Sequence, residues 1–321
     1  MSTYSLGWKG PEVERIQVRL KELGFYKGTI DGDFGGGTDA AVRAYQRSIG
    51  LEVDGKVGPN TWASLFGAEP IPEPTILRES LGQRCLALTG SFETGKMPPD
   101  CFAGISGDFD GQGMSYGALQ WNFGQQSLQP LLKEMNTTYP SMLQEIFAQE
   151  YQPLIDVLGK NLQAQMAWVR SIQHPVQHFV FEPWRGFFKT LGRTPEFQGI
   201  QVKYAEHLQQ KAFNLCQEYQ LWSPRAEALM FDIVVQNGSI SAVVRQTIMQ
   251  EIGNLRPELD REALELEKMR IIANRRSEAC KSQWVEDVRS RKLTCANGEG
   301  IVHGITFHLS QQFGIDLHSI I

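Results

Sequence analysis

Two carboxylates, Glu93 and Asp110, occupy contrasting settings in the sequence. Glu93 ends an apolar helical pattern that runs from Arg78 to Phe92, whereas Asp110 lies among glycines and polar residues. Cleavage of a glycosidic bond uses one protonated carboxyl, which gives its proton to the leaving oxygen, and one ionised carboxylate, which activates water. Apolar surroundings favour the protonated form and polar surroundings the ionised form. The sequence therefore predicts Glu93 as the acid and Asp110 as the base.

An irregular segment, residues 94–118, must position Asp110. It contains six glycines and two prolines, a density that excludes a helix and favours a short sheet or hairpin with exposed turns. Helical signals dominate the chain from residue 76 onward. Ser223 followed by Pro224 is typical of a helix start, and Gly238 of a helix end. This part of the sequence is predicted to be mainly α, with a small β-hairpin insert.

The segments around the two carboxylates carry a family resemblance. Leu88–Glu93 and Asp110–Gly117 are similar to the catalytic segments of glycoside hydrolase family 46 chitosanases. The resemblance implies a lysozyme-like domain, the acid position for Glu93, the base position for Asp110 and inversion at the anomeric carbon. Gln112 stands where that family has Arg, and Met114 with Ser115 where it has Tyr and Thr. These departures leave the substrate subsite open.

Polar and aromatic residues follow the predicted base. Sugar rings present apolar faces and a rim of hydroxyl groups, so aromatic rings beside amide groups suit a glycan cleft. Core packing is the alternative for each ring, and it is the favoured one for Phe123. The predicted substrate contacts are Ser115, Tyr116, Gln120, Trp121 and Asn122.

Asp108 and Asp232 are predicted to support the cleft. Asp232 is the charged residue of Phe231–Gly238, a segment that resembles the central buried helix of the lysozyme-like superfamily. A lone buried carboxylate is costly unless it is paired. Asp232 is therefore expected to pair with an arginine such as Arg275 or Arg276 and to shape the cleft from behind.

An internal repeat marks the N-terminal region. The pattern Asp-Gly-x-apolar-Gly-x-x-Thr occurs at residues 31–38 and again at 54–61, each time before a short helical stretch. Asp and Gly suit a tight turn, the apolar residue inserts into a core, and Thr is predicted to cap the next helix. With the apolar spacing of residues 13–23, the repeat predicts three short helices, a small three-helix bundle.

These turns resemble the small three-helix peptidoglycan-binding domain of bacterial and phage cell-wall enzymes, over residues 11–67. The resemblance implies a wall-binding groove, and its predicted lining is Asp31, Tyr45, Asp54 and Trp62. From the residues alone, turns that fold the domain and bind nothing are the alternative. The predicted organisation is a peptidoglycan-binding domain at 1–67, an extended Pro-rich linker at 68–75 and a lysozyme-like catalytic domain at 76–321.

Composition excludes several other classes. Asp and Glu outnumber Lys and Arg by 36 to 31, which argues against a general nucleic-acid footprint. No apolar run is long enough for a membrane span, and a monomer is expected. No metal or cofactor is expected, because Asp108–Gln112 lacks the closing Glu of a calcium loop and His174 with His178 lacks an H-E-x-x-H frame. The five cysteines are expected to be reduced, and Cys101 to be a buried thiol rather than a nucleophile.

Together these observations predict a peptidoglycan glycoside hydrolase of the muramidase type, similar to phage endolysins and held on the wall by its N-terminal domain. The alternatives are a chitosanase, a lytic transglycosylase that needs only Glu93, and a non-catalytic wall-binding protein. The first fifteen residues contain no apolar signal-peptide core. The enzyme is therefore expected to be made in the cytoplasm and to reach the wall through a membrane pore or a secretion machine.

Overall fold

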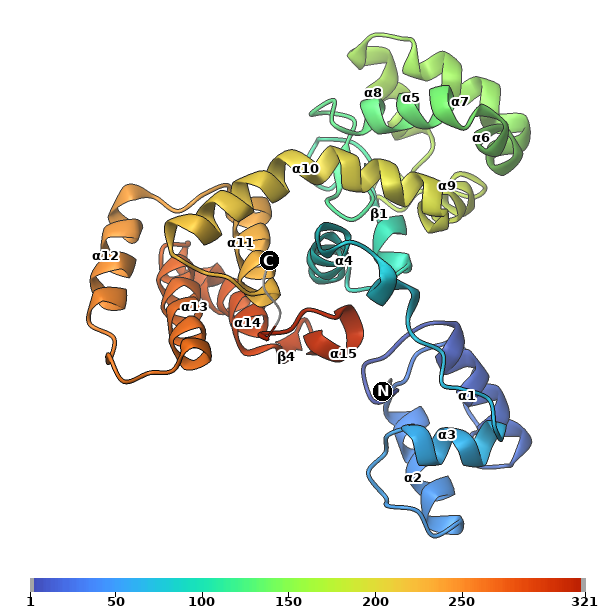
Figure 1. Cartoon of the computed structure of the whole chain (residues 1–321). Coiled ribbons are helices and arrows are strands. Elements are labelled where there is room, and N and C mark those ends of the chain that lie inside the picture. Colours follow the sequence, from blue (N-terminus) through green and yellow to red (C-terminus); the bar gives the residue numbers. More distant parts are fainter. Residues whose placement is uncertain (1–2, 319–321) are drawn as a thin grey trace. The chain divides into compact units, whose positions relative to one another are not determined.

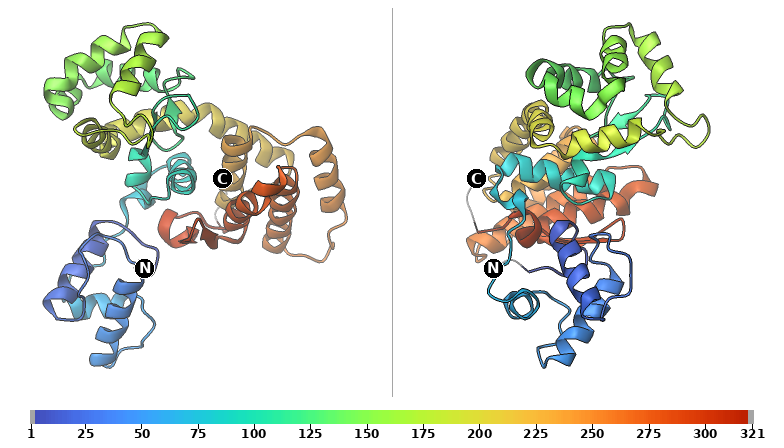
Figure 2. Two further views of the ribbon diagram at one scale, coloured as in Figure 1. Left: turned by 180° about the vertical axis from the view of Figure 1, so that it is seen from behind. Right: turned by 90° about the vertical axis from the view of Figure 1, so that its right-hand side faces the viewer.

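The computed structural model describes residues 3–318 and divides into two compact units. The first contains the chain up to Cys85 together with residues from Ala212 onward, and the second contains Leu86–Lys211 (Figure 1). Helices dominate both units, as the other views also show (Figure 2). Strands within the described range form one three-stranded and one two-stranded sheet. The predicted mainly α fold with a small β insert is confirmed, while the domain boundaries at 67 and 75 stay a prediction.

The N-terminal helices are the three that the repeat predicts. They are α1 (Pro11–Glu22), α2 (Gly36–Ser48) and α3 (Pro59–Phe66). Phe34 and Val57, the apolar residues of the two turns, are fully buried in the core between these helices. The inserted apolar residue therefore joins each turn to the bundle, as expected.

A buried glutamine holds each turn of the repeat. The Gln17 side chain donates to Asp31 Oδ1 at 2.8 Å and accepts from the amide of Gly32 at 2.9 Å. Gln46 repeats this arrangement in the second turn, with Asp54, Gly55 and Lys56. Because a buried amide is costly without partners, these bonds fix the shape of both turns.

The threonines of the repeat do not cap the helices that follow them, and that prediction is wrong. The N-cap residues are Gly35 and Gly58, neither of which has a capping side chain. Thr38 and Thr61 are buried within the first helical turn, where each hydroxyl accepts a hydrogen bond from the glutamine amide. The threonines complete the polar interior of the turns.

The Pro-rich segment at 68–75 is extended and is bonded to the bundle it leaves. The Tyr4 hydroxyl donates to the carbonyl of Pro72 at 2.8 Å, and Arg15 pairs with Glu69 at 2.8 Å. Ile71 packs against the core of the bundle. The segment ends in a short 3-10 turn, η1 (Thr75–Arg78).

The second unit begins within α4 (Leu81–Thr94) and then forms the irregular insert. A 3-10 turn, η2 (Asp100–Ala103), leads to the antiparallel sheet β1 (Ile105–Ser106), β2 (Ser115–Tyr116) and β3 (Trp121–Asn122), in that order. The predicted hairpin is confirmed, with a third strand beyond residue 118.

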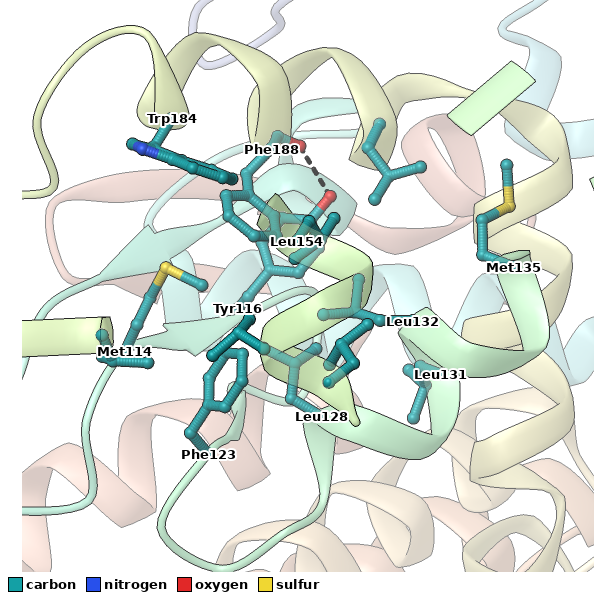
Figure 3. Packing of buried hydrophobic residues seen from close by; sticks show 14 of the residues in the cluster. Met114, Tyr116, Phe123, Leu128, Leu131, Leu132, Met135, Leu154, Trp184 and Phe188 are labelled. Atoms are coloured by element: carbon teal, nitrogen blue, oxygen red, sulfur yellow. Dashed lines mark hydrogen bonds between the residues drawn. The ribbon is translucent and has the colours of Figure 1, made fainter. Parts of the chain in front are cut away.

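Helices complete the second unit around an aromatic and aliphatic core (Figure 3). They are α5 (Leu128–Thr138), α6 (Pro140–Phe147), η3 (Ala148–Glu150), α7 (Tyr151–Leu158), α8 (Leu162–Ser171), α9 (Trp184–Arg193) and α10 (Pro195–Glu218). Tyr116 and Phe123 of the insert belong to this core, which ties the small sheet to the helices.

The C-terminal part of the first unit centres on α11 (Pro224–Asn237). Its start follows the sequence signal closely: the Ser223 hydroxyl accepts from the amide of Ala226, Pro224 opens the helix and Gly238, at φ 76°, ends it. The other elements are α12 (Ala242–Gly253), α13 (Arg261–Glu278), η4 (Ser282–Trp284), α14 (Val285–Asn297), β4 (Glu299–Val302), β5 (Ile305–His308) and α15 (Leu309–Phe313).

Replacing Gln46 with Ala tests the role of the buried glutamine. The variant leaves the polar groups of the 54–61 turn without their buried partner, so the local stability of this region should fall by about 1–3 kcal/mol. Hydrogen exchange of the amides in residues 36–66 measures the loss. The matched control is Arg47→Ala, at the exposed next position, which should leave exchange unchanged. Equal exchange in the two variants would contradict the assignment.

Candidate active site

Glu93 is presented by the end of α4. Every residue from Cys85 to Phe92 is buried, and Glu93 is the first exposed side chain that follows. Gly95, at φ 65°, then ends the helical run. The structure therefore departs from the apolar setting expected for Glu93, because the apolar side chains before it point into the core and leave the carboxyl at the surface.

Two close approaches fix this helix end against the small sheet. A side chain at Gly90 would clash with Ala118, in the turn between β2 and β3, at 2.8 Å. A side chain at Gly104, just before β1, would clash with Thr94. Both positions therefore need glycine, and the backbone of Glu93 is held between the two contacts.

Asp110 lies in the loop 107–114, which joins β1 to β2. Its carboxylate accepts a hydrogen bond from the amide of Gln112 at 3.0 Å and is exposed. This local bond is typical of an Asx turn. Gly111 and Gly113, at φ 83° and 79°, supply the turn conformation that other residues adopt poorly.

Asp108 anchors the same loop. One carboxylate oxygen accepts from the amide of Gly113 at 2.8 Å, and the other pairs with Arg170 at 3.2 Å. The side chain of Gln173 accepts from the backbone amide of Asp108 at 2.9 Å. Asp108 therefore holds the loop through Arg170 and Gln173, partners that were not identified from the sequence, and its support of a substrate cleft stays a prediction.

The structure brings both carboxylates to the same three-stranded sheet. Thr94, next to Glu93, lies against Gly104 at the start of β1, and Asp110 follows the other end of β1. Strand β1 has two residues and is about 7 Å long, so Thr94 and the loop that carries Asp110 are at opposite ends of a very short strand. One exposed carboxyl therefore lies at a helix end and the other on an Asx turn, and their predicted roles as acid and base stay a prediction.

Tyr116 is not a surface platform, and its predicted contact with substrate is wrong. It is fully buried, and its hydroxyl donates to the carbonyl of Phe188 at 2.6 Å (Figure 3). Its ring also stacks against Phe197. Burial raises the pKa of this phenol well above its usual value. Phe123 is fully buried as well, so the core alternative holds for both rings.

The other predicted contacts stay close to the sheet. Ser115 and Trp121 are half-buried on β2 and β3. The Gln120 amide accepts from the hydroxyl of Ser106 at 2.9 Å and donates to the backbone of the preceding turn. Asn122 is buried and accepts from the amide of Gln125 at 2.8 Å. Gln120 and Asn122 therefore hold turns, and contact of these four residues with substrate stays a prediction.

Asp232 is fully buried and paired, but not with the expected arginines. It pairs with Arg291 at 2.6 Å and with Lys292, both on α14. Arg275 instead binds Glu251 and Glu278, and Arg276 donates to the backbone of Ser239. Burial acts to raise the pKa of Asp232, but the two neighbouring cations outweigh it and hold the pKa below its usual value.

The predicted wall-binding residues divide between surface and core. Tyr45 and Trp62 are 6% and 1% exposed and pack inside the bundle, so their rings do not line a groove, contrary to prediction. Asp31 and Asp54 each bind a buried glutamine amide. The hydrogen bond from Gln17 lowers the pKa of Asp31. The aspartates therefore shape the turns, and contact with the wall stays a prediction for them.

The cysteines and the possible metal ligands show no arrangement typical of a nucleophile or a metal site in residues 3–318. All five cysteines are free, as expected for reduced thiols, and burial raises the pKa of Cys101 to about 12. Residues 3–318 contain no group of three or more His, Cys, Asp or Glu side chains that could hold a metal ion. Within the same range, no helix is long and apolar enough to cross a membrane.

Comparison with known proteins identifies the N-terminal region. Residues 9–65 match the family model of a putative peptidoglycan binding domain, which confirms that prediction. The amidase CwlM of Mycobacterium tuberculosis is 49% identical over 57 residues, which are 18% of this chain and 14% of that protein. A spore cortex-lytic enzyme of Halalkalibacterium halodurans is 51% identical over 59 residues, 18% of each chain. The chain thus spans less than a fifth of the length of these two relatives.

Solved structures align over a longer part of the chain but at lower similarity. The native chitosanase from Bacillus subtilis MY002 is 16% identical, with a TM-score of 0.44, and the alignment covers 76% of this chain and 94% of that one.

Replacing Asp108 tests whether this residue holds the loop. Asp108→Ala removes the acceptor for the Gly113 amide and should lower the local stability of residues 107–114 by about 1–3 kcal/mol. Arg170→Ala is the matched control, because the Arg170 side chain is 59% exposed and an exposed pair contributes less than about 1 kcal/mol. Hydrogen exchange of residues 107–114 reports both changes. Equal losses in the two variants would refute the anchoring role.

Replacing Asp232 tests the buried ion pair. Asp232→Ala leaves Arg291 and Lys292 buried without their carboxylate and should destabilise α11 and α14 by about 3–5 kcal/mol. Lys292→Met should cost less, because Arg291 still neutralises Asp232. In the unchanged protein, the lowered pKa means that this contribution is complete above about pH 4 and is lost as the pH falls through the folded-state value. Denaturant unfolding at several pH values measures both the stability of the variants and its dependence on pH. A fall in the free energy of unfolding as the pH rises from about 3 to 6 would contradict the pairing.

Proposed function

We propose that this chain hydrolyses the glycan strand of peptidoglycan as a muramidase-type enzyme. Glu93 protonates the leaving oxygen and Asp110 activates the attacking water. The observation that carries the proposal is the presentation of these two exposed carboxylates at one small sheet, on a chain whose residues 9–65 match a peptidoglycan-binding family. The similarity of that region to cell-wall lytic enzymes supports the same substrate.

The N-terminal domain holds the enzyme on its insoluble substrate. Tethering raises the local concentration of the catalytic residues at the wall, so turnover does not require the catalytic residues themselves to bind the glycan tightly. The enzyme acts as a monomer, and it reaches the wall after release through a membrane pore or delivery by a secretion machine. A chitosanase is the second candidate, because the segments Leu88–Glu93 and Asp110–Gly117 resemble that family.

Carboxylate substitutions with product analysis test the proposal. Glu93→Gln and Asp110→Asn should each slow the release of fragments from purified peptidoglycan by about 100- to 10,000-fold, the usual contribution of acid–base groups. Glu145→Gln, an exposed carboxyl on α6, is the matched control and should remain fully active.

Mass spectrometry of the fragments separates the alternatives. New reducing ends on N-acetylmuramic acid support a muramidase. Anhydro ends from an active Asp110→Asn variant would indicate a lytic transglycosylase instead. Activity on chitosan without activity on peptidoglycan would indicate a chitosanase. Binding to the wall with no fragments at all would leave a non-catalytic wall-binding protein.

A further inference from the structure

Phe109 stands out because it is 71% exposed between two aspartates. Folding gains little from an aromatic ring in water, and although single exposed apolar residues are common, a contiguous group of them is a sign of a binding site. Tyr116, a ring that the sequence predicted as a sugar contact near the base, is buried in the core, and so is Phe123. Phe109 is the ring that the loop exposes beside Asp110.

The loop holds Phe109 rigidly. Asp108, the preceding residue, is fixed by the Gly113 amide and by Arg170, and the amide of Gly124 donates to the Gln112 carbonyl at 2.7 Å. A side chain at Gly107 would clash with the carbonyl of His178, so the loop lies directly on the segment 173–180. A ring on such a loop is ordered before a ligand arrives, which lowers the entropic cost of binding.

Other aromatic rings continue from Phe109 along this neighbouring segment. The His178 ring contacts the Phe109 ring edge-on, with centroids 5.1 Å apart. His174 stacks on Phe179 at 5.1 Å, and Phe179 contacts Phe181 at 5.5 Å. Phe179 and Phe181 are 42% and 37% exposed. We call these five residues, Phe109, His174, His178, Phe179 and Phe181, the aromatic ridge.

The bonded charges beside the aromatic ridge favour a neutral ligand. Arg170 pairs with Asp108, and Arg185 pairs with Glu182 at 2.8 Å. Both cations are thus already matched by carboxylates, and Asp110 adds a negative charge next to Phe109. A polyanion or an anionic lipid surface would need unmatched cations at this place. The apolar face of an uncharged sugar needs none.

We propose that the aromatic ridge is a sugar-binding subsite for N-acetylated glycan, with Phe109 stacking on the sugar next to the one attacked through Asp110. This inference rests on the proposed function, since it assigns the substrate of the same site. It makes Phe109 a specificity-determining residue. The ring adds affinity for the glycan and takes no part in proton transfer.

Binding of an oligomer of six N-acetylglucosamine units to the full chain tests the subsite by calorimetry. Phe109→Ala should weaken binding about five- to tenfold, the size of one aromatic contact, and Phe109→Trp should keep it. Trp284→Ala removes a ring that is 54% exposed on η4 and should bind like the unchanged protein. Since Phe109 is mostly exposed, the melting temperature of Phe109→Ala should not move.

Further measurements separate the subsite from the hydrolase. In peptidoglycan digestion, Phe109→Ala should raise KM with little change in kcat. Unchanged oligomer affinity in Phe109→Ala, or a Phe109-dependent affinity for phosphatidylglycerol vesicles, overturns the subsite while leaving the roles of Glu93 and Asp110 intact. Conversely, if the oligomer binds in a manner that depends on Phe109 but the protein digests no glycan, the subsite is supported and the proposed hydrolase function is wrong.

Discussion

The close approach of α4 to the small sheet is the constraint on which the candidate site depends. Glycine at positions 90 and 104 lets the helix end and the sheet touch where any other residue would clash with Ala118 or Thr94. Glycine inside a helix costs about 1 kcal/mol relative to Ala, and the buried contacts on both sides of it offset that cost. Glu93 lies between these two contacts. The backbone of Glu93 is therefore fixed in position, although its side chain is exposed at the surface.

Polar side chains that bind backbone amides carry the rest of the architecture. Gln17 and Gln46 hold the turns of the N-terminal bundle, and Asp108 holds the loop that carries Asp110 in the same manner. Gln201 of α10 adds a further case, since it accepts from the amide of Ala118 and donates to the carbonyl of Phe102. Short loops rich in glycine lack side chains of their own to pack. A side chain from a neighbouring helix supplies the missing partner and makes them rigid.

Sequence reasoning succeeded where the signal was local. The repeat, its inserted residues Phe34 and Val57, and the start of α11 at Ser223 all follow from short patterns. It failed where a distant partner decides. From residue type alone, Trp62 and Tyr116 fit a sugar-binding surface and a hydrophobic core equally well. Both are buried in the core, where they pack against helices that are distant in the sequence. The partners of Asp232 lie 59 and 60 residues away. The adjacent cations Arg291 and Lys292, followed by the apolar residues of the same helix, were a usable signal for them.

The exposure of Glu93 bears on the order of events in the proposed reaction. A general acid keeps its proton best in surroundings from which water is excluded. A glycan strand lying across the sheet would itself exclude water from Glu93. Asp110 differs, because the amide of Gln112 already binds its carboxylate in the absence of substrate. In the proposed reaction, the loop therefore preorganises Asp110, and the bound sugar completes the surroundings of Glu93. A ridge that binds the neighbouring sugar acts on the affinity for the strand and not on the reacting atoms, which is why its loss is expected to change KM more than kcat.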